Sequence, residues 1–221
     1  MSTEVIEISS QEQLNLPSSE AANPDQLPLR TPWTLYFSSA TKNSSWEMTK
    51  VFEAKSVGDF MLYVNHTKLP SAFASTIELS LFRSGVTPDW EVEPCKSGGR
   101  WTVRVDKLAD SQIDSTWLEL LLSMVGESFV SELPRSLWDS VVGLAYSGKP
   151  GSAKKLSLWT SIRGQEEAMA VGNRFRDVLQ GLLPDRDLGE IAFNDFTSGD
   201  KYAFTIGKKK LIIRGNRQSH N

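Results

Sequence analysis

The stretch Gly98-Gly99-Arg100-Trp101-Thr102-Val103-Arg104-Val105-Asp106 alternates apolar and polar side chains. Trp101, Val103 and Val105 fall on one face of an extended chain, and Arg100, Thr102 and Arg104 on the other. This period of two predicts a half-buried strand. A helical period follows in residues 115–125, where apolar side chains form one stripe: Trp117, Leu118, Leu121, Leu122 and Val125. The two patterns together predict a helix packed on one face of a sheet.

The same two periods recur along the rest of the chain. They predict strands at residues 33–38, 48–54, 76–83, 141–146, 155–160, 191–196 and 211–214, and helices at 56–65 and 165–182. The segments 141–146 and 155–160 predict a hairpin, because the loop between them is rich in turn residues. Ser56 and Asp59 fit a helix-capping pattern. With no internal repeat and no second polar linker, we expect one α+β domain at 29–221: an antiparallel sheet with three helices on one face.

Composition is that of an ordinary globular protein, with 39% hydrophobic and 23% charged residues and a net charge of −3. Residues 1–26 contain five acids and no Lys or Arg, so the remainder carries a small positive charge. We expect residues 1–28 to form a disordered acidic tail. The single cysteine excludes an internal disulfide and a thiolate zinc cluster. No apolar run reaches membrane-spanning length, and the N-terminus lacks a signal-peptide pattern.

Catalytic motifs are scarce. His66 ends a predicted helix, His220 is next to the last residue, and Cys95 has no histidine near it in sequence. No glycine-rich phosphate loop, nucleophile elbow or metal-ligand spacing is present. The sequence therefore favours a binding protein over an enzyme, with no cofactor and no metal.

Two tryptophans stand in polar stretches that predict loops. Trp90 follows a Gly-x-x-Pro turn and precedes Glu91, and Trp46 ends the polar run 41–45. Two indoles can stack on a base, each contact contributing about 1–3 kcal/mol. A neighbouring carboxylate can accept two N–H bonds from a guanine edge. Each residue alone has an ordinary alternative, core packing or solvation, but together they predict a site for a small ligand that contains a base.

Strand parity adds a second constraint. Lys155, Ser157 and Trp159 share one face of the predicted strand at 155–160, with Lys155 and Trp159 about 13 Å apart. This spacing suits an indole at a base and an ammonium group at a phosphate chain. A solvated sheet face would accept the lysine but gives no reason for the tryptophan.

Several blocks in series resemble the cap-binding translation initiation factor 4E family over residues 27–185. They are Leu27-Pro28-Leu29, Trp46, Val57-Gly58-Asp59-Phe60, Ser80 to Glu91, Gly98-Gly99-Arg100-Trp101, Trp117-Leu118-Glu119, Gly126-Glu127-Ser128-Phe129 and Leu158-Trp159-Thr160. The family fold implies a curved antiparallel β-sheet with three helices on its convex face. The family's function implies that this chain binds the 7-methylguanosine cap of mRNA and recruits a scaffold partner in translation initiation.

The resemblance also implies roles for single residues. Trp46 and Trp90 would sandwich the methylated base, Glu91 would accept from the guanine edge, and Trp159 would touch the methyl group. The phosphates would be held by Arg100 and Lys155. A helical peptide from a scaffold or repressor would bind the convex face, at positions that also suit core packing: Leu27, Pro28, Val57, Met61, Trp117, Leu118, Glu119 and Leu122.

This chain departs from the family pattern at three positions. Leu27 replaces a histidine, and Met61 replaces the usual tryptophan of the partner groove. Ala145 stands where the family has a phosphate-contacting arginine, and Lys154, Lys149 or Arg163 are candidates to replace its charge. A basic C-terminal cluster at 208–217 either approaches the ligand or forms a solvated edge.

The departures leave two functions open: an initiation factor, or a weak cap-binding regulatory paralogue that represses or stores mRNAs. A nucleotide-processing enzyme on the same fold is the third alternative. For the first two we expect a cytoplasmic monomer, with a nuclear fraction left open, that has no membrane contact and binds capped mRNA and a helical peptide.

Overall fold

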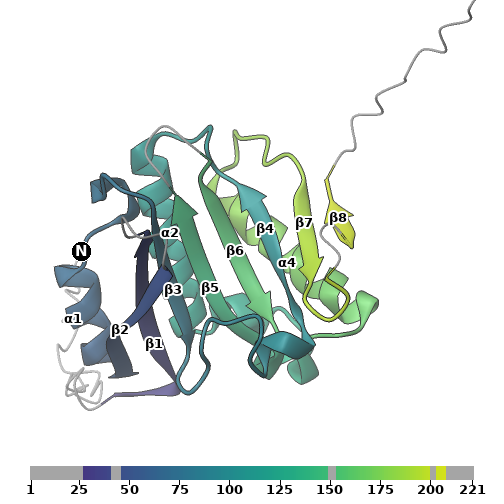
Figure 1. Ribbon diagram of the computed structural model, residues 1–221, viewed down its shortest axis with the longest axis horizontal. Helices are drawn as coiled ribbons and strands as arrows, with labels where there is room; N and C mark the ends of the chain where they lie inside the picture. Colours follow the sequence, from purple (N-terminus) through teal and green to yellow (C-terminus); the bar gives the residue numbers. More distant parts are fainter. Residues whose placement is uncertain (1–26, 41–45, 149–152, 200–202, 208–221) are drawn as a thin grey trace, which may run out of the picture.

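The structure is a computed structural model that describes residues 27–40, 46–148, 153–199 and 203–207. Eight antiparallel strands form one sheet in the order β2-β1-β3-β5-β6-β4-β7-β8 (Figure 1). The strands are β1 (Pro28–Ala40), β2 (Trp46–Ser56), β3 (Ile77–Arg83), β4 (Gly99–Arg104), β5 (Val141–Gly148), β6 (Lys155–Thr160), β7 (Ile191–Asp195) and β8 (Phe204–Ile206).

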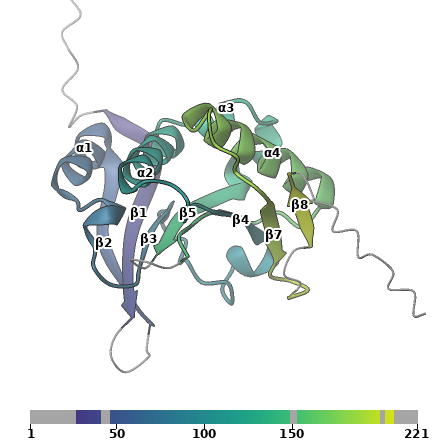
Figure 2. The same ribbon diagram turned by 90° about the horizontal axis from the view of Figure 1, so that it is seen from above.

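Three long helices cover one face of this sheet. Figure 2 shows that the sheet is curved and that α1, α2 and α4 lie on its convex side. The helices are α1 (Val57–His66), α2 (Asp110–Val125), the single-turn α3 (Ser128–Ser131) and α4 (Gln165–Leu182). Short 3-10 turns complete the described elements: η2 (Pro70–Ala72), η3 (Cys95–Ser97) and η4 (Arg135–Ser140). The predicted fold class is confirmed.

The alternation along β4 separates the core from the concave face. Trp101 and Val103 are fully buried under the helices. The indole Nε1 of Trp101 donates to the carbonyl of Ala168 on α4 at 2.9 Å. Gly172 follows one turn later, and its lack of a side chain lets α4 approach the Trp101 ring. The same strand therefore directs Arg100 to the opposite, concave face.

The predicted cap of the first helix is confirmed. Ser56 is the N-cap of α1, and its hydroxyl accepts from the Asp59 amide at 3.0 Å. The Asp59 carboxylate accepts in return from the Ser56 amide at 2.9 Å. These reciprocal bonds satisfy backbone donors that the first turn leaves without partners.

Element boundaries differ from the prediction where pairing or capping overrides the local pattern. β1 begins at Pro28, which pairs with Ser56, and not at Trp33. α2 begins at Asp110, where the Gln112 side chain accepts from the Ala109 amide at 3.2 Å. Neither β8 nor α3 was predicted. The predicted strand at 211–214 and residues 1–26 of the predicted tail lie outside the described residues. No described helix is both long and apolar enough to cross a membrane.

Candidate functional site

The concave face holds an open groove of ≈ 1030 Å³. Its floor comes from β3, β4, β5, β6 and β7, and its rim from the loops that follow β4 and α4. The lining side chains are Glu78, Arg100, Thr102, Arg104, Val105, Asp106, Lys107, Leu108, Ala145, Ser147, Lys155, Ser157, Asp185, Arg186, Asp187, Leu188, Gly189, Glu190, Ala192 and Asn194. Two residues predicted to contact phosphate, Arg100 and Lys155, are among them.

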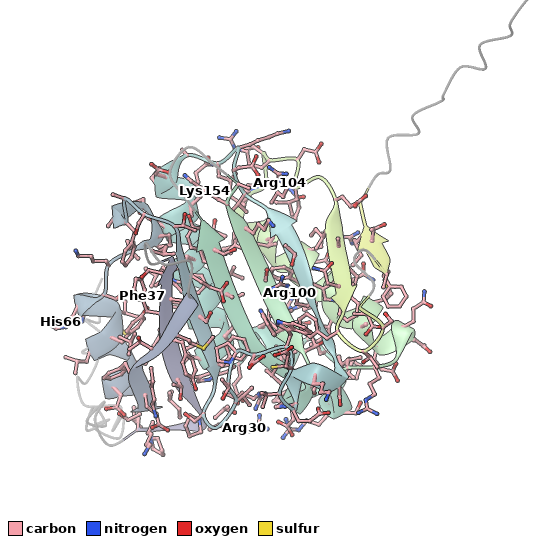
Figure 3. All side chains as sticks on the ribbon, in the orientation of Figure 1. Arg30, Phe37, His66, Arg100, Arg104 and Lys154 are labelled. Atoms are coloured by element: carbon pink, nitrogen blue, oxygen red, sulfur yellow. The ribbon has the colours of Figure 1, made fainter. Side chains whose placement is uncertain are left out.

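Arg100 lies over the middle of this face (Figure 3). Its register partner on β6 is Trp159, and its guanidinium carbon is 5.3 Å from the centroid of that indole. The ring of Phe196, whose centroid is 4.9 Å from that of Trp159, lies 5.9 Å from the same guanidinium carbon. The Nε atom of Arg100 is buried without a hydrogen-bond partner. Burial lowers the pKa of Arg100, and the nearby charge of Glu78 opposes that shift. The structure thus brings Arg100 and Trp159 into contact.

Trp90 stands on the loop between β3 and β4 with 56% of its surface exposed. Short-range bonds shape this loop: the Asp89 amide donates to the Thr87 carbonyl at 2.8 Å, and the Glu91 amide to the Asp89 carboxylate at 2.8 Å. The Glu91 side chain is exposed as well. An indole left this exposed loses the stabilisation of burial and is accessible to a ligand.

Trp46 is the first residue of β2 and pairs with Ala40 at the end of the β1–β2 hairpin. In the next pair of strands, Ser39 lies opposite Ile77 and Trp33 opposite Arg83. Trp46 is therefore near the start of β3, while the loop with Trp90 follows its end. A strand of seven residues is about 20 Å long. The backbone positions of Trp46 and Trp90 therefore lie near opposite ends of β3.

Lys154 and Lys155 are adjacent in sequence but lie on opposite sides of the sheet. The Lys154 ammonium pairs with Asp110 at the start of α2 at 2.6 Å, and its side chain is only 17% exposed. Lys154 contributes to a separate hollow of ≈ 60 Å³ on the helix side. Strand parity gives the reason, since only Lys155 shares the face of Ser157. This corrects the prediction that Lys154 contacts the phosphates.

Charges in the groove are balanced. Among the described lining residues five are cationic and five acidic: Arg100, Arg104, Lys107, Lys155 and Arg186 against Glu78, Asp106, Asp185, Asp187 and Glu190. Part of this charge is already paired, since Arg104 Nε lies 2.9 Å from Asp106 Oδ1. Ala145 lines the floor at the position where the resemblance predicts an arginine.

Burial raises the pKa of Cys95 to about 11, so this thiol is protonated at neutral pH.

The convex face carries exposed apolar side chains. Val57 donates its amide to the Leu27 carbonyl at 2.9 Å, which holds the Leu27-Pro28 segment beside the start of α1. Met61 is 40% exposed and Leu122, on the neighbouring α2, is 39% exposed. Figure 2 shows α1 and α2 side by side. The patch of Leu27, Met61 and Leu122 is called the helix-side patch below.

Three predicted partner residues fall at different depths around the helix-side patch. Glu119 is exposed and Leu118 is half-buried. Trp117 is fully buried, and its ring centroid is 6.3 Å from that of Tyr146 in the core. This corrects the prediction that Trp117 is a contact residue: in this structure it supports α2 from beneath.

Comparison with known proteins identifies the family. The profile of the eukaryotic initiation factor 4E family matches residues 28–203. The chain is 32% identical to human eukaryotic translation initiation factor 4E over 179 residues, which cover 78% of this chain and 79% of the human protein. It is also 32% identical over 156 residues to factor 4E1 of Drosophila melanogaster, covering 69% of this chain and 58% of that protein.

Solved structures agree with the sequence matches. A complex of Caenorhabditis elegans eIF4E-3 with the 4E-binding protein Mextli and a cap analog has a TM-score of 0.68 at 29% identity, covering 81% of this chain and 99% of that one. Ascaris suum eIF4E-3 with the m7G cap gives 0.69 at 29% identity, covering 83% and 99%. Fold and matches place this chain among the translation initiation factors. It belongs to the eukaryotic initiation factor 4E family, as the sequence predicted.

Two residues near Arg100 were not predicted: Glu78 in the groove lining and Phe196 beside the Trp159 ring. Glu78 shares a strand face with Ser80 and Phe82, so the parity argument that found Lys155 would also have found Glu78. Phe196 follows β7, and its contact with Arg100 depends on the pairing of β7 with β4, which no local pattern reports.

Proposed function

We propose that this chain binds the 7-methylguanosine cap of mRNA and recruits a partner in translation initiation. The observation that carries the proposal is the exposed indole of Trp90 beside the exposed Glu91, on the loop that follows β3. Family membership supports it, and relatives have been solved with cap ligands and with a 4E-binding protein. Binding without catalysis and a cytoplasmic location are parts of the same proposal.

Recognition of the base depends on charge. Methylation makes the guanine cationic, and a cation is attracted to the electron-rich face of an indole. Stacking on Trp90 places the donor edge of guanine toward Glu91, whose carboxylate accepts two N–H bonds. Adenine offers no matching pair of donors. Trp159 is buried against Phe82 and Phe196 in this structure, so it supports Arg100 from beneath and does not present its ring to the groove.

The phosphates follow the floor of the groove from Arg100 toward Lys155. The guanidinium of Arg100 lies over the rings of Trp159 and Phe196, which contact each other, so it is ordered before the ligand arrives. Lys155 is exposed at the far end. Trp46 completes the sandwich only if the terminal pairs of the β1–β2 hairpin open, because it lies near the other end of β3. Cap binding therefore includes a closing step.

The partner in this proposal is a peptide helix that docks on the helix-side patch. Exposed apolar side chains on α1 and α2 provide the contact surface, and Glu119 provides a rim charge. Met61 replaces a flat indole with a flexible thioether, which adapts to a different helix.

A second function, a weak cap-binding paralogue that represses or stores mRNAs, is favoured by one observation. Ala145 leaves its position on β5 without the arginine that the resemblance predicts, and the charges of the groove are balanced. This function differs from the first in affinity and in partner, not in the site.

The test is a fluorescence titration with 7-methylguanosine triphosphate and with GTP. We expect quenching by the methylated ligand, loss of binding in Trp90→Ala, and loss of preference over 7-methylinosine triphosphate, which lacks the amino donor, in Glu91→Gln. Trp138→Phe is the matched control, because this tryptophan lies on η4, outside the groove lining. Equal quenching by both nucleotides would refute the proposal. Intact recovery of the cap analogue would separate binding from hydrolysis.

A further inference from the structure

Glu78 is an acid on the floor of a groove that is proposed to hold phosphates. It lies on β3, lines the same groove as Arg100, and is partly buried. Its carboxylate accepts a long hydrogen bond of 3.3 Å from Ser80. Burying a carboxylate with so few local hydrogen bonds lowers the stability of the fold unless a nearby positive charge compensates it.

Small side chains separate Glu78 from Arg100. Ser80 pairs with Ala145, Ala145 with Ser157, and Ser157 with Thr102, so one row of small residues crosses the sheet between them. Thr102 and Ser157 bond to each other at 3.1 Å, which keeps their hydroxyls at the floor. No bulky side chain of this row stands between the acid and the guanidinium.

The two charges influence each other across this row. Burial raises the pKa of Glu78, and the positive charge of Arg100 is the largest effect in the opposite direction. Burial also lowers the pKa of Arg100, while Glu78 raises it. Each group thus stabilises the charged form of the other, and Glu78 acts as a counter-ion inside the groove.

We propose that Glu78 limits the affinity that ligand phosphates contribute. Its carboxylate already interacts with Arg100, so each phosphate gains less from the same guanidinium. The chain then recognises the methylated base strongly but gains little from each phosphate added. This inference depends on the proposed cap-binding function and specifies which part of the ligand the site favours.

Ala145 makes the effect larger. A second cation at this position would outweigh the charge of Glu78. The alanine instead leaves Arg100 as the one cation on the central part of the described floor, and Lys155 lies at the exposed end. A ligand phosphate near Arg100 then meets one positive and one negative charge, both on partly buried side chains, where screening is weaker than in bulk water.

The experiment is an affinity series by fluorescence at constant ionic strength. It uses 7-methylguanosine, its monophosphate and its triphosphate, with wild type, Glu78→Gln and Glu190→Gln. Glu190 is the matched control, because it also lines the groove but is exposed, on the loop before β7. We expect Glu78→Gln to strengthen triphosphate binding about three- to tenfold, leave the nucleoside unchanged, and exceed the control.

Three outcomes would overturn the inference. If Glu78→Gln and Glu190→Gln raised the triphosphate affinity equally, the effect would come from removing any acidic residue of the groove and not from Glu78 in particular. An equal gain for nucleoside and triphosphate would show altered packing in place of phosphate competition. If no methylated ligand binds, the proposed function fails, and calorimetry with inorganic tripolyphosphate then tests Glu78 alone: equal affinity of wild type and Glu78→Gln overturns the inference, and tighter binding by the variant supports it.

Discussion

Replacing Gly172 by alanine should destabilise this protein, although the same change stabilises most helices. Gly172 lies in the middle of α4, where alanine is favoured over glycine by about 1 kcal/mol. A Cβ at this position would come within 2.3 Å of the Trp101 ring and 2.8 Å of Ile206. Such overpacking costs about 1–3 kcal/mol. The helix would have to withdraw from β4, which also strains the bond from Trp101 to Ala168. Subtracting the helix-propensity gain from the overpacking cost, we expect a net loss of up to about 2 kcal/mol.

The same helix provides the control. A Cβ at Gly181 would meet nothing within 4 Å, so Gly181→Ala should gain up to about 1 kcal/mol. The assay is equilibrium denaturation by urea, followed by circular dichroism, since the tryptophan signal changes with the site itself. Trp101→Phe removes the ring atoms that clash, so Gly172→Ala should cost less in that background. A gain in stability for Gly172→Ala in wild type would refute the packing argument.

Three further predictions follow from single contacts. Ser56→Ala removes the side-chain cap of α1 and should cost about 1 kcal/mol in the free energy of unfolding, measured by urea denaturation. Lys155→Ala should weaken binding of 7-methylguanosine triphosphate severalfold in a fluorescence titration, whereas Lys154→Ala should leave the affinity unchanged; an equal effect would contradict their placement on opposite faces. Because burial raises the pKa of Glu78, wild type should lose stability as pH rises through that raised value. Unfolding curves across the acidic range should show that Glu78→Gln removes this loss.

Much of the fold was predictable because its signals are local. The alternation at residues 100–106 and the stripe at 115–125 depend on neighbours in the chain, and both elements formed as predicted. The α1 cap needed only Ser56 and Asp59. β8 was missed because three residues show no period, and its pairing with β7 decides its conformation.

The site was predictable only in part, because its geometry depends on contacts between distant strands. Because side chains alternate along a strand, the sequence alone places Lys155 and Trp159 on one face of β6. The same rule separates Lys154 from Lys155, but the ion pair of Lys154 with Asp110 joins residues 44 positions apart. The burial of Trp117 likewise depends on Tyr146 beneath it, which an apolar stripe on one helix does not reveal.

Two different physical causes would weaken cap binding in this chain, and they act on different parts of the ligand. In the proposed function Trp46 reaches Trp90 only after the terminal hairpin pairs open, so only a fraction of molecules would be competent to form the sandwich. Such a requirement reduces the apparent affinity by that fraction for every ligand that needs the sandwich, with or without phosphates. Competition by Glu78 affects only ligands that carry phosphates. The ratio of triphosphate to nucleoside affinity therefore isolates the electrostatic cause, because the hairpin cost cancels from it. A low nucleoside affinity with a steep gain from phosphates would assign the weakness to the hairpin instead.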